Sequence, residues 1–496
     1  MESFLNITEH LLDKKLGRSS GRGRDSPGSN AGSASRRYSN QSDFPDQPSP
    51  SSHGHSKEAN PALKKKFLKR LAIALHAYGN SSTRTEYLVE KASRQLNVAA
   101  SVAVFPTVIL LSFQSDDRDP AKPETHLLTV EPGLNVDKLG RADELANRVG
   151  MEHMPLLVGY WRLRAIATAP PQFGEIKRLL SFGVAGCTSA VLFFNGNLYS
   201  GALAALLGLV AGLFDLVASR SNVFANVTTF LSATCVALLS RLLALYLPAR
   251  FDLCFFSMTL GSLVWLLPGL SLTVGVSELT SGAKVSGSAR VMGALFEALQ
   301  LGFGMETAQG LVWWAPRVKR ACNAATQPVW LQLILFLLYS VASNALLQAR
   351  WDQWPGMILT SAVGFFVSTA ASAVFAANVL ASVAIGLTGT LYSRYSGHLP
   401  VTMTLSGILI LVPGGLGVRG SAALLEHDLL SGVGFTMDML VVSLSITLGL
   451  LIAKIVLPSG FFGSSRLPHE DQMSLAAQME DDRDEGTEGD EEDMAI

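Results

Sequence analysis

The feature that most constrains this chain is a long stretch with almost no charge. From Leu179 to Pro458, only 21 of 280 residues are Asp, Glu, Lys or Arg, whereas both ends of the chain are densely charged. Crossing the hydrocarbon layer takes about 20 mostly apolar residues. Ten such segments follow one another, at about 179–195, 198–219, 222–247, 251–270, 288–308, 328–347, 355–373, 374–393, 400–424 and 434–457. Because backbone groups in lipid must be satisfied internally, the pattern predicts a polytopic α-helical membrane protein with about ten transmembrane helices.

The flanking parts of the chain differ from this stretch in composition. Residues 1–60 are rich in Ser, Gly, Arg, Asn and Pro, which predicts a disordered tail. Residues 61–174 contain amphipathic helical patterns and two strand-like runs, 101–113 and 126–132, which predict a small α/β domain. The membrane halves are expected at 175–310 and 326–460. An acidic disordered tail is expected at 461–496, with ten Asp or Glu after Met479 against one Arg.

Basic residues give the expected orientation. Arg162, Arg164, Lys177 and Arg178 precede the first span, which places the α/β domain in the cytoplasm by the positive-inside rule. With ten spans, both termini are then cytoplasmic. The basic cluster at 317–320 falls on the opposite side and disagrees. The organelle stays open, with the plasma and vacuolar membranes as alternatives.

Composition also excludes several classes of protein. Charged residues make up 16% of the chain and the formal net charge is −1, so there is no sustained basic surface for nucleic acid. The four cysteines form no C-x-x-C pair and have no nearby histidines, so we expect buried small hydrophobic side chains and neither metal nor cofactor.

An apolar-Pro-Gly motif recurs in the fourth and ninth spans. LVWLLPGLSL contains Pro268 and Gly269, and ILILVPGGLG contains Pro413 and Gly414. The predicted topology gives these spans opposite directions, which indicates a five-plus-five inverted repeat. That construction is typical of secondary transporters, in which interrupted helices expose backbone groups to substrate. The alternative is a simple kink or helix end at each site.

Charged residues next to or within the spans are candidates for the transport path, because ionisable groups at such depth usually face a wet cavity and pair with each other. Glu297 is the sharpest of them, since a desolvated carboxylate there would exchange a proton during transport. The alternative is that it only pairs between helices. Asp215 is expected to pair with Arg241, to bind a substrate ammonium or to lie at the interface. The segment after the fourth span adds Glu278, Ser286, Gly287 and Arg290.

The α/β domain has its own group of candidates, in LHAYGNSSTRTEYL. His76, Gly79, Arg84 and Glu86, with Ser81 and Ser82 between them, invite an enzymatic interpretation. However, no G-x-S-x-G elbow, H-E-x-x-H helix or phosphate loop accompanies them. A structural histidine is the alternative, so we assign no catalytic residue and expect no enzyme.

These segments resemble a known family. LAIALHAYGNSSTRTEYLVEKASRQLNV, followed by AVFPTVILLSF, resembles the start of the bacterial threonine/serine exporter family, as do LPGL at 267–270 and SGSAR at 286–290. From the sixth span to the VPG of 412–414 the chain is similar to that family's second membrane module. The resemblance covers about residues 61–460. The long tail and acidic C-terminus are similar to its fungal branch, the pheromone-regulated membrane proteins numbered ten.

The resemblance implies a two-module transporter. In the bacterial relatives, threonine and serine are moved outward at the expense of the ion gradient. We therefore expect a secondary transporter of small polar solutes, with amino acids as substrate class, the lipid bilayer as surroundings, protons as a candidate coupling ion and the site near Pro268 and Pro413. The alternatives are a membrane-anchored signalling or scaffold protein in mating or cell fusion, and a hydrolase acting through His76. Oligomeric state stays open.

Overall fold

The computed structural model describes residues 61–114, 123–131, 133–150, 154–248, 251–314, 327–371, 376–412, 414–425 and 429–457. All of these residues belong to one compact unit. The two tails predicted to be disordered lie outside the described residues, as does the basic cluster at 317–320. The proposed division of the remainder into domains stays a prediction.

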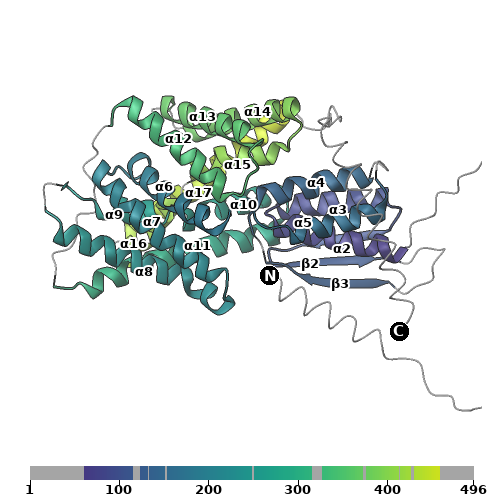
Figure 1. The fold of residues 1–496 in the computed structure, drawn as a ribbon, viewed down its shortest axis with the longest axis horizontal. Coiled ribbons are helices and arrows are strands. Elements are labelled where there is room, and N and C mark those ends of the chain that lie inside the picture. Colours follow the sequence, from purple (N-terminus) through teal and green to yellow (C-terminus); the bar gives the residue numbers. More distant parts are fainter. Residues whose placement is uncertain are drawn as a thin grey trace, which may run out of the picture. The chain divides into compact units, whose positions relative to one another are not determined.

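The first described part is an α/β segment, residues 61–168. Helices α2 (Pro61–Ala77), α3 (Ser82–Gln95), α4 (Val136–Gly150) and α5 (Leu156–Thr168) lie on one face of an antiparallel sheet (Figure 1). The strands are β1 (Ala100–Val104), β2 (Val108–Phe113) and β3 (Glu124–Thr129), in the order β1-β2-β3. Alternate β2 side chains, Ile109, Leu111 and Phe113, are buried in a core shared with the helices, as expected for a sheet covered on one face.

The first strand-like run, 101–113, is two strands rather than one. Pro106 lies in the turn between β1 and β2, where proline's missing N–H removes no ladder hydrogen bond. The Phe105 N–H donates to the Val108 carbonyl at 2.8 Å and closes the turn. Ala103 is paired with Leu110, which sets the register of the hairpin.

The remainder of the described chain is helical, and every segment predicted to span the membrane coincides with a helix or a pair of helices. These are α6 (Glu175–Leu192), α7 (Leu198–Ala218), α8 (Asn222–Tyr246), α9 (Phe255–Ser262), η2 (Val264–Leu266), α10 (Gly269–Thr280), α11 (Lys284–Leu311), α12 (Val329–Leu346), α13 (Trp354–Ala370), α14 (Ala377–Ser396), α15 (Pro400–Leu411), α16 (Gly414–Leu425) and α17 (Leu429–Val456).

Fewer helices than ten meet a strict criterion for spanning. Among the described residues, five are long and apolar enough to cross a membrane, and a sixth is added when the bent pair α9–α10 counts as one. Large apolar side chains point outward from several of them, as in Leu206 at 60% exposed and Ile455 at 78%. The architecture is that of a polytopic helical membrane protein, while the count of ten and the repeat remain predictions.

The two helices predicted to break do so. The chain bends by 62° between α9 and the segment Val264–Thr280, which contains η2 and α10, and Pro268 is the residue before α10. In the second half, α15 ends at Leu411, Val412 is extended with φ −65° and ψ 128°, and α16 begins at Gly414. Pro413 itself lies outside the described residues.

One expectation about the cysteines is wrong. Cys254, the residue before α9, is disulfide-bonded, whereas Cys187 and Cys235 are free, as expected, but only half-buried. Spacing and apolar neighbours do not distinguish a paired cysteine from a buried one, because the bond depends on two distant segments being close in space.

Candidate functional site

The two interrupted helices meet at their breaks. A Cβ atom added to Gly269 would lie 2.0 Å from Val412 Cγ1 and 2.7 Å from the Gly414 backbone nitrogen. A Cβ atom on Gly414 would in turn lie 2.7 Å from Leu267 Cβ. Only glycine permits so close an approach of backbones. The recurring Pro-Gly motif therefore marks two positions that are about 145 apart in the chain and in contact in the fold.

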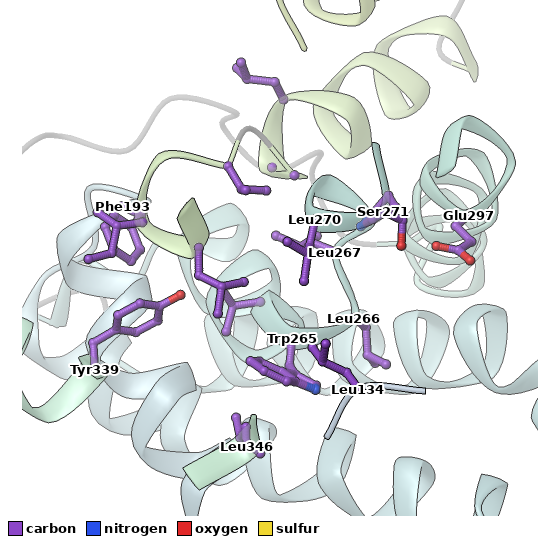
Figure 2. A pocket seen from close by; sticks show the side chains of 18 of the residues that line it. Leu134, Phe193, Trp265, Leu266, Leu267, Leu270, Ser271, Glu297, Tyr339 and Leu346 are labelled. Carbon is purple, nitrogen blue, oxygen red and sulfur yellow. The ribbon is translucent and has the colours of Figure 1, made fainter. Parts of the chain in front are cut away.

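A cavity of about 590 Å³ lies beside this crossing. Its walls are mostly aliphatic and aromatic, and Figure 2 shows Phe193, Trp265, Leu267 and Tyr339 around it, with the Tyr339 hydroxyl directed toward the interior. Both breaks contribute, through Pro268 of the first and Val412 and Gly414 of the second. A cavity of this size, in which polar groups converge between apolar side chains, is typical of sites for small molecules. The polar side chains that line it are Arg178, Thr229, Ser271, Glu297, Tyr339, Gln348 and Arg419.

Two opposite charges in the cavity have no ion-pair partner among the described residues. Glu297 comes from α11, and Figure 2 shows its carboxylate on the same side as Ser271. Arg419 comes from α16, and its guanidinium lies over the Phe194 ring, 5.9 Å from the centroid. A carboxylate and a guanidinium without counter-charges are available to a ligand that carries both an ammonium and a carboxylate.

A third charge of the cavity is neutralised. Arg178, near the start of α6, pairs with Asp215 of α7 at 2.6 Å. The predicted pairing of Asp215 with Arg241 is therefore replaced by a pairing with Arg178, because the start of α6 lies beside the end of α7. With its carboxylate occupied by a guanidinium, Asp215 is a weaker candidate for binding a substrate ammonium than Glu297.

Four other predicted residues form a second, separate cluster where α10 and α11 contact the α/β segment. Glu278 is 1% exposed and accepts three hydrogen bonds, from the Ser82 backbone N–H at 2.8 Å, the Ser286 hydroxyl at 2.8 Å and Arg290 Nε at 3.1 Å. The Ser82 hydroxyl lies 2.7 Å from that of Ser286. Gly287 permits this arrangement, since a Cβ there would lie 2.7 Å from the Gly275 carbonyl oxygen.

The candidates in the α/β segment have structural partners rather than a shared site. Arg84 pairs with the buried Asp143 of α4 at 3.1 Å, and a Glu86 carboxylate oxygen accepts the Val104 N–H at 2.7 Å. Burial raises the pKa of Glu86, so it gains a proton more easily than an exposed glutamate.

His76 is fully buried in the α/β segment. Its Nε2–H donates to the Pro106 carbonyl at 2.9 Å, and its Nδ1 has no hydrogen-bond partner among the described residues. Burial, with a further contribution from Arg290, lowers the pKa of His76, which keeps the ring neutral at pH 7. A neutral imidazole inside a core fits the structural interpretation of this histidine.

Sequence reasoning missed several residues that line the cavity. Arg419 follows Gly414 of the second break by five residues and is the first charged residue after it, which is a usable signal. Leu134 and Gln348 carry no signal of their own, because apolar and amide residues outside the spans are common. Only the folded chain brings them to the cavity.

Comparison with known proteins gives two family matches. Residues 66–312 match the model described as "Putative threonine/serine exporter", and residues 332–456 match the one described as "Threonine/Serine exporter, ThrE". Their boundary falls between α11 and α12, where the sequence predicts the division into halves. No solved structure matches.

Relatives with the printed name "Pheromone-regulated membrane protein 10" are similar over most of the chain. That of Kluyveromyces lactis is 27% identical over 417 residues, covering 79% of this chain and 43% of the relative. The relative from Eremothecium gossypii is 27% identical over 418 residues, covering 79% of this chain and 56% of the relative. The relative from Candida glabrata is 26% identical over 424 residues, covering 80% of this chain and 53% of the relative. The chain thus spans about half the length of these relatives.

The apolar helices and the names of the relatives agree that this is an integral membrane protein. The two family models follow one another in the order that the motifs predict, and together they cover most of the residues from α2 to α17. The resemblance inferred from the motifs is confirmed, and the chain belongs to the threonine/serine exporter family.

Proposed function

We propose that this protein is a secondary transporter of small zwitterionic solutes, with amino acids as the substrate class. The observation that carries the proposal is the cavity of about 590 Å³ at the crossing of two interrupted helices, with Glu297 and Arg419 facing it. Secondary transporters of several folds bind substrate where helices are interrupted, because helix ends and free backbone groups are available there. The family membership supports the same class of function.

The charges of Glu297 and Arg419 are each suited to bind one charged group of the substrate. Glu297 would pair with the substrate ammonium, and Arg419 would hold the carboxylate, for which a planar guanidinium is well suited. The apolar walls leave room for a short side chain, and the Ser271 and Thr229 hydroxyls would meet a polar one. Glu297 would also exchange a proton when substrate leaves, which couples flux to a proton gradient.

We also propose that the α/β segment faces the cytoplasm, with both chain termini on that side. Lys177, Arg178 and Arg220 lie at the ends of α6 and α7 that are nearest to it. Cys254 is at the opposite end, because the Ser200 hydroxyl at the start of α7 accepts its backbone N–H. Disulfides persist in oxidising compartments, so the bonded Cys254 favours a lumenal or extracellular position for that end.

Flux of labelled amino acids into proteoliposomes tests the proposal. Glu297→Gln is expected to abolish proton-coupled flux, and Arg419→Gln to weaken substrate binding, while both proteins stay folded in the membrane. Glu306→Gln is the matched control, since Glu306 is on the same helix, outside the cavity, and hydrogen-bonded to Gln309. Unchanged flux in the Glu297 variant removes this residue from the mechanism, and an absence of flux for every amino acid in the wild type overturns the substrate class.

A further inference from the structure

One wall of the cavity comes from outside the membrane helices. Leu134 lies between β3 and α4 of the α/β segment, yet it lines the cavity. Its side chain packs in an apolar cluster with Trp265 and Leu270, which flank the first break. Figure 2 shows Leu134 beside Trp265 at the edge of the cavity. A residue of the soluble part therefore reaches the proposed substrate site.

The backbone around Leu134 is held by the turn after α2. The Gly133 N–H donates to the Ala77 carbonyl at 2.9 Å, and the Asn135 N–H donates to the Tyr78 carbonyl at 3.2 Å. Gly79 completes the turn with φ +100°, a conformation that favours glycine. A Cβ at Gly79 would lie 2.7 Å from Leu134 Cδ1, so the absence of a side chain here sets where Leu134 lies. Gly79, a candidate site residue from the sequence, therefore positions the Leu134 side chain.

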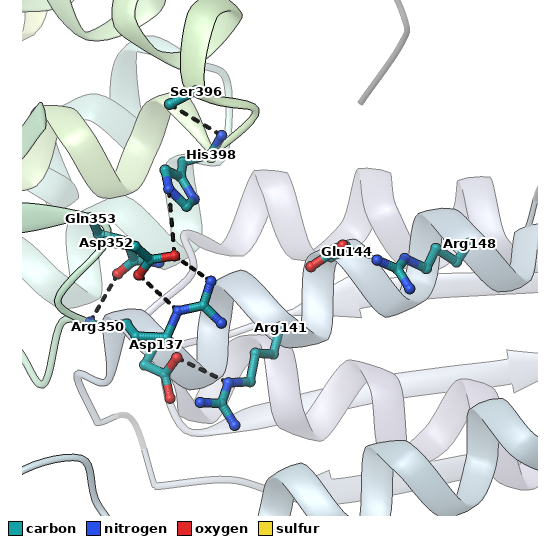
Figure 3. Close-up of polar contacts among 9 residues, drawn as sticks. All are labelled: Asp137, Arg141, Glu144, Arg148, Arg350, Asp352, Gln353, Ser396 and His398. Carbon is teal, nitrogen blue, oxygen red and sulfur yellow. Dashed lines mark hydrogen bonds and ion pairs between the residues drawn. The ribbon is translucent and has the colours of Figure 1, made fainter. Parts of the chain in front are cut away.

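The same segment is attached to the second membrane half. The Val136 N–H donates to the Leu347 carbonyl at 3.0 Å, and both side chains are fully buried. Polar contacts also hold the turn that follows α12. Asp352 in this turn accepts a hydrogen bond from Arg350 Nε, and its carboxylate lies 3.6 Å from Nε2 of His398, just before α15 (Figure 3). The position of Leu134 thus depends on the second half.

The first half is attached to the α/β segment at a different point. The start of α3 binds Glu278 and Ser286 through the backbone and side chain of Ser82. Leu134 is therefore presented by a segment that contacts both halves of the membrane part, one through α3 and the other through α4. A relative movement of the two halves changes these two attachments and must displace Leu134 or strain its turn.

We propose that Leu134 is the access-determining residue on this side of the cavity, that it blocks the path between the cavity and the α/β segment, and that Gly79 fixes its position. This inference rests on the proposed function, because access to the cavity matters only if a solute passes through it. If Leu134 only fills space in the apolar cluster, a smaller side chain at this position leaves the accessibility of the cavity unchanged.

Thiol labelling of the full chain in proteoliposomes separates the two roles. The free cysteines Cys187 and Cys235 are replaced by Ser, and Thr229→Cys is introduced as a reporter at a half-buried position of the cavity wall. A membrane-impermeant thiol reagent is added to vesicles whose α/β segment faces the bath, an orientation verified by its digestion with protease. The labelling rate is corrected for the same chain without the reporter.

Leu134→Ala is expected to raise the labelling rate several-fold, because a smaller side chain opens the path. Leu134→Met, of similar volume, is expected to keep the original rate. Gly79→Ala is expected to raise it as well, since the new methyl group displaces Leu134. The matched control is Leu157→Ala on α5, an exposed leucine of the same segment that does not line the cavity.

An unchanged rate in Leu134→Ala overturns the proposal and leaves Leu134 as a packing residue. If that variant does not yield folded protein, Leu134→Val gives the same comparison with a smaller loss of volume. Labelling needs no substrate, so the two proposals fail separately. A faster rate with no transport of any amino acid supports the access role and contradicts the transport function, whereas normal transport with an unchanged rate does the reverse.

Discussion

The buried carboxylate of Glu278 offers a demanding test of how the α/β segment is held on the membrane helices. Glu278→Gln keeps the shape but removes the charge, and the new NH₂ group has to face either the Ser82 N–H or the Ser286 hydroxyl. Arg290, whose side chain is 17% exposed, then loses its counter-charge. Removing one partner of a buried ion pair costs about 3–5 kcal/mol. Because Arg290 keeps some contact with water, we take the lower end, about 3 kcal/mol.

Hydrogen exchange at the first turn of α3 measures this loss directly. Each 1.4 kcal/mol is a factor of ten, so about 3 kcal/mol makes exchange at the Ser82 amide about 100-fold faster if the loss falls on local opening. Mass spectrometry of peptides that contain Ser82 gives the rate.

The matched control is Glu144→Gln, because Glu144 is 52% exposed and pairs with Arg148 four residues along the same helix. Such a pair contributes about 0.3–0.5 kcal/mol, which leaves exchange at Ser82 nearly unchanged. The reasoning is refuted if Glu278→Gln and Glu144→Gln give the same exchange at Ser82. Arg290→Gln adds a second comparison, because removing the other partner of the ion pair is expected to make hydrogen exchange at the Ser82 amide faster.

Three further predictions concern the crossing, the buried histidine and the tails. Gly269→Ala is expected to cost about 1–3 kcal/mol of stability and to reduce flux, because its Cβ would overlap Val412, whereas Gly293→Ala on α11 has open space and leaves thermal stability unchanged. His76 has a pKa lowered from 6.5, so the unfolded chain binds a proton that the folded chain does not, and stability falls as pH drops below about 6.5; His76→Gln is expected to flatten this dependence in thermal unfolding between about pH 7.5 and about pH 5.5. Deleting residues 1–60 and 470–496 is expected to preserve flux in proteoliposomes, and a loss of flux would favour the scaffold alternative.

Local patterns predicted most of the helices and the position of both breaks. A continuous apolar run specifies a helix by itself, and proline and glycine interrupt one wherever they occur inside it. The Pro268–Gly269 motif and its counterpart at 413–414 were therefore readable from the chain alone. The split of residues 101–113 into two strands was missed, although Pro106 within that run was a signal.

The partners of the charged residues were less predictable. Asp215 pairs with Arg178 rather than Arg241, and Glu278 binds Ser82, which is 196 residues away. Charge and hydrophobicity along a sequence indicate that a buried carboxylate needs a partner, but they do not name it. The candidates of the α/β segment lie close together in the sequence, yet Arg84 and Glu86 bind different structural partners within that segment.

The sequence by itself determined that this is a helical membrane protein, because spans of about 20 apolar residues have few alternatives to a helix in lipid. It also determined where two of those helices stop being regular. Only the tertiary structure decided that the two breaks touch, that Glu297 and Arg419 line one cavity, and that Leu134 of the α/β segment lines it too. These are contacts between distant segments, and they depend on how helices pack in three dimensions, which no local pattern of residues specifies.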